Sequence, residues 1–173
     1  PTTGFKMQPG YLDAYALYFT KFVQAYEKEG IKIEAVNIQN EPCSTQKYAS
    51  CTWRPEDMAY FIGKFLGPKF EKENIQTEIF FGTINRDNPQ YTKTALDDPA
   101  ASKYIKGVGF QWDGKGAIPT IHKEYPHLKM MHTEAECGNG SNDWGAAEHT
   151  WWQISHYMRN GARVFTYWNM ILD

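Results

Sequence analysis

Hydrophobic positions along the chain follow two spacings, one typical of helices and one typical of buried strands. From Tyr11 to about Glu29 the apolar side chains recur every three or four residues, which predicts an amphipathic helix. Gly30 follows at the position where a helix commonly ends. Short, nearly continuous apolar runs occur further along, and such runs are typical of strands buried on both faces. The predicted strands cover residues 31–41, 78–84, 107–112, 128–134 and 163–170.

Helices are predicted between these strands from their start and stop signals. Pro55 is followed by two acidic residues, which suits the first turn of a helix because of the shape of proline and the direction of the helix dipole. The pair Gly67-Pro68 is expected to break or restart that helix, and Asp98 and Asp143 are placed to cap later ones. The predicted helices cover residues 55–73, 99–106, 118–125 and 143–160, the last with Trp151, Ile154, Tyr157 and Met158 on one face. Residues 43–53 and 85–94 are predicted to be loops, the second with room for one helical turn.

This alternation of strands and helices predicts an α/β protein with a parallel sheet and right-handed crossovers. No glycine-rich phosphate loop follows any of the strands, so a nucleotide-binding fold has no support. The strands are short and evenly spaced, as in a (β/α)₈ barrel, which normally takes about 250 residues and eight strands. About five strands are counted here. The pattern therefore indicates either an open five-stranded sheet or the later part of a barrel.

The composition limits the possible partners. A chain of 173 residues, 42% hydrophobic and 22% charged, is long enough for one domain with its own core. A net charge of −2 gives no electrostatic reason to expect nucleic acid as a partner, and no apolar run is long enough for stable membrane insertion. The aromatic fraction of 16% is high, and aromatic rings both fill cores and line sugar-binding clefts. The chain starts at Pro1, just before a helix and without a visible signal peptide, so we expect it to be part of a longer protein.

The three cysteines, Cys43, Cys51 and Cys137, match no zinc-binding spacing. Cys43 and Cys51 flank a short polar loop and could form a disulfide in an oxidising compartment, which would leave Cys137 over. Whether they are bridged stays open at this point. No metal and no cofactor is expected.

Two predicted strands end in a glutamate, Glu41 and Glu134. Pro42 cannot donate to a sheet, so it should end the first strand and hold Glu41 in an extended conformation. In the later strand, alternation places Met130, His132 and Glu134 on one face. The carboxyl ends of parallel strands meet at one edge, where barrels carry their chemistry. Two carboxylates facing one cleft are what a glycosidase needs, because one protonates the leaving oxygen and the other attacks or activates water.

Other readings of these residues remain. His132, Glu134, Glu136 and Cys137 are conceivable metal ligands, but their spacing fits no familiar site. Glu136 is a rival to Glu134 for the attacking carboxylate. His132 is more simply explained as a residue that forms hydrogen bonds inside the barrel. A non-catalytic carbohydrate-binding module would carry aromatic platforms without the pair of carboxylates.

Longer motifs around these glutamates carry a family resemblance. Asn40-Glu41-Pro42, Thr133-Glu134-Ala135 and Tyr167-Trp168-Asn169 lie in the stretches NIQNEP, HTEAECGNGSNDW and YWNMILD, and GVGFQW lies between them. Together they resemble glycoside hydrolase family 30, the family of the glucosylceramidases, in the clan of retaining (β/α)₈ glycosidases. The resemblance implies that residues 1–173 form a single partial catalytic domain, a C-terminal part of a TIM barrel that carries strands four to eight. Strands one to three, the last helix and the usual β-sandwich would lie outside it.

The resemblance also implies roles for particular residues. Carried over by position, Glu41 is the acid/base and Glu134 the nucleophile of a double displacement. The expected substrate-binding residues are Asn40, which would bind the sugar 2-hydroxyl, Gln111 and Trp112, which would line the cleft, and Trp168 and Asn169, of which Trp168 would be a sugar platform. Many relatives carry His or Tyr near the position of Gln111 to steady the nucleophile, and that help is not evident here.

Substrate and setting are expected only in outline. A glucosylceramide or a β-1,6-glucan is favoured as the carbohydrate or glycolipid substrate, and a xylan-type polysaccharide is the alternative. A catalytically incompetent fragment remains the other possibility. We expect the protein to be extracellular or secreted. We also expect a truncated barrel to self-associate, because its sheet edges would be unpaired.

Overall fold

The computed structural model describes residues 2–136, 141 and 143–169, and its centre is a parallel sheet. Five strands form this sheet in the order β2-β4-β5-β6-β7, and every neighbouring pair is parallel. The strands are β2 (Ala35–Asn37), β4 (Glu78–Ile84), β5 (Ile105–Gln111), β6 (Lys129–Glu134) and β7 (Ala162–Phe165). The predicted α/β class is therefore confirmed, and spatial order follows chain order as it does in a barrel.

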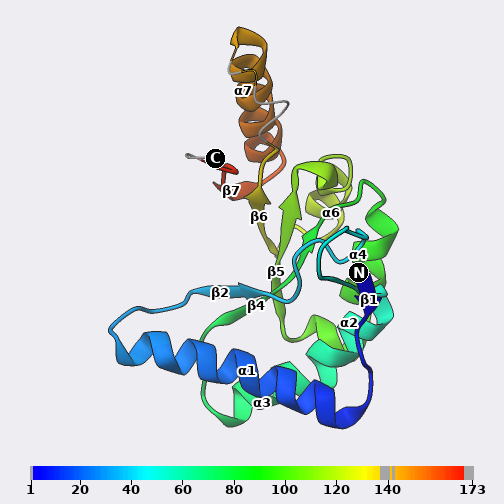
Figure 1. Ribbon diagram of the computed structural model, residues 1–173, viewed down its shortest axis with the longest axis vertical. Helices are drawn as coiled ribbons and strands as arrows, with labels where there is room; N and C mark the ends of the chain where they lie inside the picture. Colours follow the sequence, from blue (N-terminus) through cyan, green and yellow to red (C-terminus); the bar gives the residue numbers. More distant parts are fainter. Residues whose placement is uncertain (1, 137–140, 142, 170–173) are drawn as a thin grey trace.

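Helices connect successive strands and lie beside the sheet. The helices are α1 (Pro9–Lys28), α2 (Pro55–Phe61), α3 (Gly67–Lys72), α4 (Pro89–Leu96), α5 (Pro99–Ser102), α6 (Ile118–Glu124) and α7 (Trp144–Arg159). In Figure 1, α2, α4 and α6 lie on the same side of the sheet, α1 crosses below β2, and α7 stands at the opposite end beside β7. Among the described residues, no helix is long and apolar enough to cross a membrane.

The core lies between the sheet and these helices. Its strand members alternate with residues that face the other side, so the sheet has one face packed against helices and one open face. Representative core residues, each at most 4% exposed, are Met58, Phe61, Ile79, Phe81, Val108, Phe110, Ile118 and Met130.

The helical stretch after Pro55 has no gap, and a new α-helix, α3, starts at Gly67, as the predicted restart at Gly67-Pro68 requires. A π-helical segment, η1 (Ile62–Leu66), joins α2 to α3. Pro68 has no N–H and would leave a carbonyl one turn earlier without its donor. The wider π turn adjusts the ladder just before the proline, with the Gly67 N–H donating to the Ile62 carbonyl.

Several element boundaries differ from the prediction. The first strand of the large sheet is only Ala35–Asn37, although residues 31–41 were expected to form it. Most of helix α4 (Pro89–Leu96) lies in the predicted loop 85–94, and its start is marked by the Asn88 side chain accepting from the Gln90 N–H. Loop 43–53 contains β3 (Ser50–Thr52), which pairs in parallel with β1 (Thr2–Gly4). This second sheet has no sequence signal, because its strands are three residues long and half-buried at most where described.

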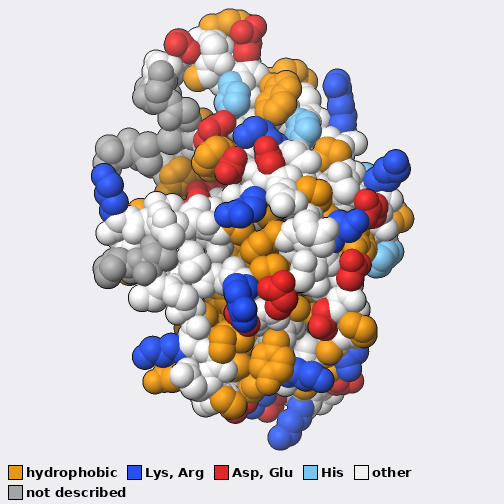
Figure 2. Space-filling view, turned by 90° about the vertical axis from the view of Figure 1, so that its right-hand side faces the viewer, with side chains coloured by type: hydrophobic (Ala, Val, Ile, Leu, Met, Phe, Trp, Pro, Cys, Tyr) orange, Lys and Arg blue, Asp and Glu red, His pale blue; other side chains and the backbone are white. Residues whose placement is uncertain are grey.

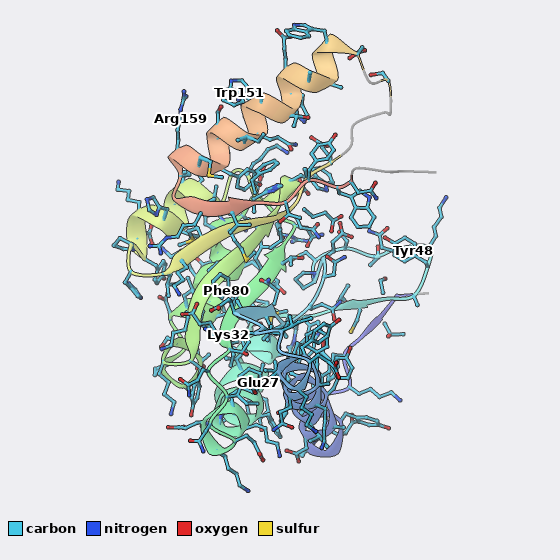
Figure 3. All side chains as sticks on the ribbon, turned by 90° about the vertical axis from the view of Figure 1, so that its left-hand side faces the viewer. Glu27, Lys32, Tyr48, Phe80, Trp151 and Arg159 are labelled. Carbon is cyan, nitrogen blue, oxygen red and sulfur yellow. The ribbon has the colours of Figure 1, made fainter. Side chains whose placement is uncertain are left out.

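Helix α7 buries only part of the expected face, through Tyr157, and adds Gln153 to it. Gln153 and Tyr157 are fully buried, whereas Trp151 is 68% exposed and Met158 is 43% exposed. Figure 3 shows Trp151 and Arg159 directed away from the sheet. The helix therefore packs through an amide and a phenol, because the Glu136 carboxylate and the Gln111 carbonyl at the end of β5 accept their hydrogen bonds.

Two features of the surface bear on earlier expectations. Cys43 and Cys51 are free thiols, so the conceivable disulfide between them is absent from the structure, and Cys137 lies outside the described residues. On the face drawn in Figure 2, acidic and basic side chains are interspersed, without a broad field of one sign.

Candidate active site

Glu41 lies on a strained turn at the carboxyl edge of the sheet. Beyond β2 the chain stays beside β4, with the Gln39 N–H donating to the Gly82 carbonyl (3.0 Å) and the Thr83 N–H to the Gln39 carbonyl (2.6 Å). Glu41 then adopts a φ of 46°, in the left-handed region that non-glycine residues rarely enter. The expected extended conformation is therefore wrong.

The turn at Glu41 is held from both sides. The Glu41 N–H donates to Oγ1 of Thr83 (3.3 Å), and the Ser44 N–H donates to the Glu41 carbonyl (3.1 Å). These bonds offset the cost of the unusual φ, which is about 1–3 kcal/mol for residues in such regions. Residues that several contacts hold in an unfavourable backbone conformation are found mostly at functional sites.

Glu134 reaches the same edge through an irregularity in β6. Phe110 pairs with His132, but the next residue, Gln111, pairs with Glu134, so one residue of β6 is skipped in the register. His132 lies on the helix side, fully buried against Tyr157 of α7 and Phe165. Because of the register shift, Glu134 does not share that side and meets Gln111 instead. The prediction that Met130, His132 and Glu134 share one face is therefore wrong for Glu134.

A single amide connects the two strand ends. Nε2 of the fully buried Gln111 donates to Oε2 of Glu134 (3.0 Å) and to Oδ1 of Asn40 (2.7 Å). Oγ1 of Thr83 also donates to Oδ1 of Asn40 (3.2 Å), so both lone pairs of that carbonyl are used. Asn40 is exposed, and its amide nitrogen is the part that can donate outward. The contact network therefore joins β2, β4, β5 and β6 at their carboxyl ends.

The electrostatics of the site couple the two carboxylates. Burial raises the pKa of Glu134, and the nearby negative charge of Glu41 raises it further. Gln111, its hydrogen-bond partner, is neutral and supplies no compensating positive charge. Glu134 therefore holds a proton to higher pH than an ordinary carboxyl, and the charge of Glu41 is one cause of that shift.

Glu136 points to a different set of partners. Its Oε1 lies 2.5 Å from Nε2 of His149 and accepts a hydrogen bond from Nε2 of Gln153 (3.0 Å), both on α7. These contacts tie the segment after β6 to the helix. They leave Glu134, rather than Glu136, beside Gln111 and Asn40.

The alternative reading as a metal site has no structural support in the described residues. No group of three or more His, Cys, Asp or Glu side chains in that part of the chain is arranged to hold a metal ion. His132 is stacked on Phe165, with ring centroids 4.0 Å apart. Neither of its ring nitrogens forms a hydrogen bond of ordinary geometry among the described residues. Burial lowers the pKa of His132 to about 4, so the ring is neutral at physiological pH.

The aromatic candidates, Trp112 and Trp168, follow strands β5 and β7. Trp112 begins a 3-10 turn, η2 (Trp112–Gly114), directly after Gln111, and Nζ of Lys115 lies 5.3 Å from its ring centroid. Trp168 is 49% exposed and follows β7. Oδ1 of Asn169 is buried without a hydrogen-bond partner in the described part of the chain. Their roles as substrate-binding residues stay predictions.

Two residues in the site had no place in the sequence prediction. Thr83 follows the cluster of apolar residues in β4, and a polar residue at that strand end was the signal that could have identified it. Gln46 donates from Nε2 to Oε2 of Glu41 (2.8 Å). It lies in an irregular polar loop, and nothing in its spacing marks it.

Parallel strands bring the side chains of Gln111, Asn40, Glu41 and Glu134 to their common carboxyl edge. This arrangement is typical of part of a hydrolase site in an α/β barrel. Comparison with known families agrees. Residues 3–173 match the family model described as "Glycosyl hydrolase family 30 TIM-barrel domain". The chain belongs to this family, and the resemblance noted in its motifs is confirmed.

Endo-1,6-glucanases and glucosylceramidases are among the similar proteins. The chain is 28% identical to the endo-1,6-beta-D-glucanase neg1 of Aspergillus fumigatus, over 98% of this chain and 34% of that protein. It is 28% identical to the lysosomal acid glucosylceramidase of Mus musculus, over 78% of this chain and 28% of that protein. Among solved structures, the endo-beta1,6-glucanase BT3312 superposes with a TM-score of 0.87 at 26% identity, covering 99% of this chain and 40% of the other. The chain thus spans about a third of the length of these curated relatives.

Proposed function

We propose that the protein is a retaining β-glycosidase in which Glu134 is the nucleophile and Glu41 the acid/base. The observation that carries this proposal is the bridge made by Gln111, whose Nε2 holds Oε2 of Glu134 and Oδ1 of Asn40, the neighbour of Glu41. This bridge brings two strand ends into one site with a carboxylate on each. The family membership and the glycosidases among the relatives support the proposal.

The two carboxylates have separate tasks in this mechanism. In the first step, Oε1 or Oε2 of Glu134 attacks the anomeric carbon while Glu41 protonates the departing glycosidic oxygen. In the second, Glu41 takes a proton from water, and the water displaces Glu134 from the sugar. Forming the glycosyl ester removes the negative charge of Glu134, which favours the ionised form of Glu41 at the moment when a base is needed. A retaining mechanism requires the carboxyl groups to lie about 5–5.5 Å apart in the substrate complex.

Asn40 has the right chemistry for the sugar 2-hydroxyl. Its carbonyl is occupied by Gln111 and Thr83, so its N–H groups are the ones that can donate to a ligand. Hydrogen bonds to the 2-hydroxyl strengthen in the transition state of glycoside hydrolysis. Asn40 therefore contributes to catalysis as well as to binding.

We propose a β-linked glucoside as the substrate, with a β-1,6-glucan favoured over glucosylceramide and over xylan. The proposal rests on the endo-1,6-glucanases among the relatives and on the TM-score of 0.87 with one of them. An assay of the protein as its gene encodes it, on β-1,6-glucan, glucosylceramide in detergent and xylan, decides between the three.

The mechanism is tested by following the first-formed product. Proton NMR of the hydrolysis of the active β-linked substrate should show the β anomer first, and the α anomer only later through mutarotation. The α anomer appearing first would contradict the assignment of Glu134 as a nucleophile. Binding of the glucan without any turnover would favour the non-catalytic reading instead.

A further inference from the structure

The loop that follows Glu41 is closed onto the site. The Trp53 N–H donates to the Pro42 carbonyl (3.0 Å), and Nε1 of Trp53 donates to Oε1 of Gln39 (3.3 Å). Trp53 is 4% exposed and its ring stacks on Phe5, with centroids 4.2 Å apart. Both ends of the loop are therefore fixed at its root, on either side of Glu41.

The far part of this loop is fixed as well. Strand β3 pairs with β1, and the Gln46 N–H donates to Oγ of Ser50 at the start of β3 (3.3 Å). At its near side, the Asn85 side chain accepts from the Cys43 N–H (3.2 Å) and donates to Oγ of Ser44. The backbone on both sides of Gln46 is therefore held by hydrogen bonds, and the Gln46 side chain is directed toward Glu41.

In the hydrogen bond between Gln46 and Glu41, Gln46 is the donor and Glu41 the acceptor. Nε2 of Gln46 donates to Oε2 of Glu41 over 2.8 Å, and the contact is partly buried. An amide N–H can only donate, so Oε2 must remain an acceptor. When Glu41 carries a proton, that proton is favoured on Oε1, because the unprotonated oxygen of a carboxyl group is the better acceptor for the Gln46 N–H.

We infer that Gln46 is a positioning residue that fixes which oxygen of Glu41 carries the transferable proton. This inference rests on the proposed role of Glu41 as acid/base. Oε1 then gives the proton to the glycosidic oxygen in the first step and receives one from water in the second. Without Gln46 the carboxyl group can rotate and place its proton on either oxygen, so only part of the protonated population is aligned with the leaving group.

The test uses the dependence of rate on leaving group. Glu41 assists departure strongly when the leaving group is a poor one, such as an alcohol, and hardly at all when it is a good one, such as 2,4-dinitrophenolate. The protein as its gene encodes it is assayed on aryl and alkyl β-glycosides of the sugar that the NMR experiment shows to be cleaved. The variants are Gln46→Met, which keeps the length of the side chain, and Gln46→Glu, which keeps its shape, and both remove the donor.

The expected result is selective. Gln46→Met should lower kcat/KM on the order of 10-fold for poor leaving groups and leave it within about 2-fold for the dinitrophenyl glycoside, since a hydrogen bond between neutral groups contributes up to about this much. Gln46→Glu should have the larger effect because it places a second carboxylate beside Glu41. Gln76→Met is the matched control: Gln76 is exposed, its Nε2 donates to the Asn74 carbonyl, and its loss should change neither rate.

Each contrary outcome has a distinct meaning. Equal losses for good and poor leaving groups in both Gln46 variants, with melting temperatures below that of the parent, would reduce Gln46 to a structural residue and overturn the inference. Unchanged rates in both variants would overturn it too. If Glu41→Gln shows the leaving-group dependence and the Gln46 variants do not, the inference fails while the proposed function stands. If the parent protein cleaves none of the glycosides, both fail.

Discussion

The surroundings of Glu134 favour its protonated form. Burial and the charge of Glu41 raise its pKa, and its hydrogen-bond partner is the neutral amide of Gln111. As the proposed nucleophile, Glu134 must attack in its ionised form, so we expect the folded protein to carry this charge at a cost to its stability. Such a cost is expected at a functional site and would be selected against elsewhere.

That cost can be measured with Glu134→Gln. Because the folded-state pKa is raised, the folded state binds the proton more tightly than the unfolded state, and ionisation weakens folding as pH rises above the ordinary carboxyl range near about 4.3. The variant cannot ionise, so it should melt above the parent at pH 7. The difference should shrink as pH falls and vanish once the parent carboxyl is protonated in both states. Calorimetry or circular dichroism across pH 4–7 measures this, and a variant that melts lower at pH 7 would contradict the assigned cause.

Activity separates the two neighbouring glutamates. Glu134→Gln should lower kcat by at least about 10⁴-fold, the scale on which loss of a covalent nucleophile acts in other hydrolases. Glu136→Gln keeps the shape of its side chain beside His149 and Gln153, and should retain turnover within about 10-fold because it touches no reacting atom. Steady-state kinetics on the cleaved glycoside decide the point. Near-full activity in the first variant and loss in the second would show that the nucleophile is Glu136.

At the scale of elements, the sequence predicted which segments are helices and strands better than how they meet. Strands β4 and β6 and helix α6 agree with the predicted ranges to within one residue, because their apolar runs and flanking signals are strong. The register shift that brings Glu134 beside Gln111 was not predictable, since it depends on pairing between β5 and β6. The left-handed turn at Glu41 was not predictable either, because Thr83 of another strand holds it.

Glycines determine how closely the helices approach one another. A Cβ on Gly63 of η1 would lie 2.8 Å from the backbone carbon of Ala100 and 2.9 Å from the Ala101 nitrogen, in and beside α5. Gly63→Ala should therefore cost about 1–3 kcal/mol, as overpacking of a filled core does. Gly10 in α1 has nothing within 4 Å of its Cβ position and is the control, for which alanine should be neutral or stabilising by up to about 1 kcal/mol. Denaturant titration compares the two, and equal midpoints would refute the close approach.

At the scale of the whole molecule, the sheet has an open side and two ends. Among the described strands, β2 pairs only with β4 and β7 only with β6. The open side contains a hollow of about 550 Å³ lined partly by Lys32 and Phe80, which Figure 3 labels, together with Met131 and Val164. Apolar residues on an open sheet face and unpaired strand edges both favour association with another surface.

We therefore predict that the 173-residue chain self-associates when it is prepared alone. Size-exclusion chromatography with light scattering should show a mass that increases with concentration, or soluble aggregates. The expected thermal transition is broad and dependent on concentration. A monomer at all concentrations with one sharp, cooperative unfolding transition would contradict the prediction.

The central claim is that Glu134 attacks the sugar and forms a covalent intermediate, and one measurement addresses it directly. A 2-deoxy-2-fluoro β-glycosyl fluoride of the cleaved sugar forms the intermediate quickly and releases it slowly, because fluorine destabilises the positively charged transition state of the second step while fluoride remains a good leaving group. Peptide mass spectrometry of the protein treated with this reagent should find the fluorosugar on the segment Lys129–Glu134, with fragment ions placing it on Glu134. A label on Glu136, or an active enzyme that inactivates without any label, would contradict the account.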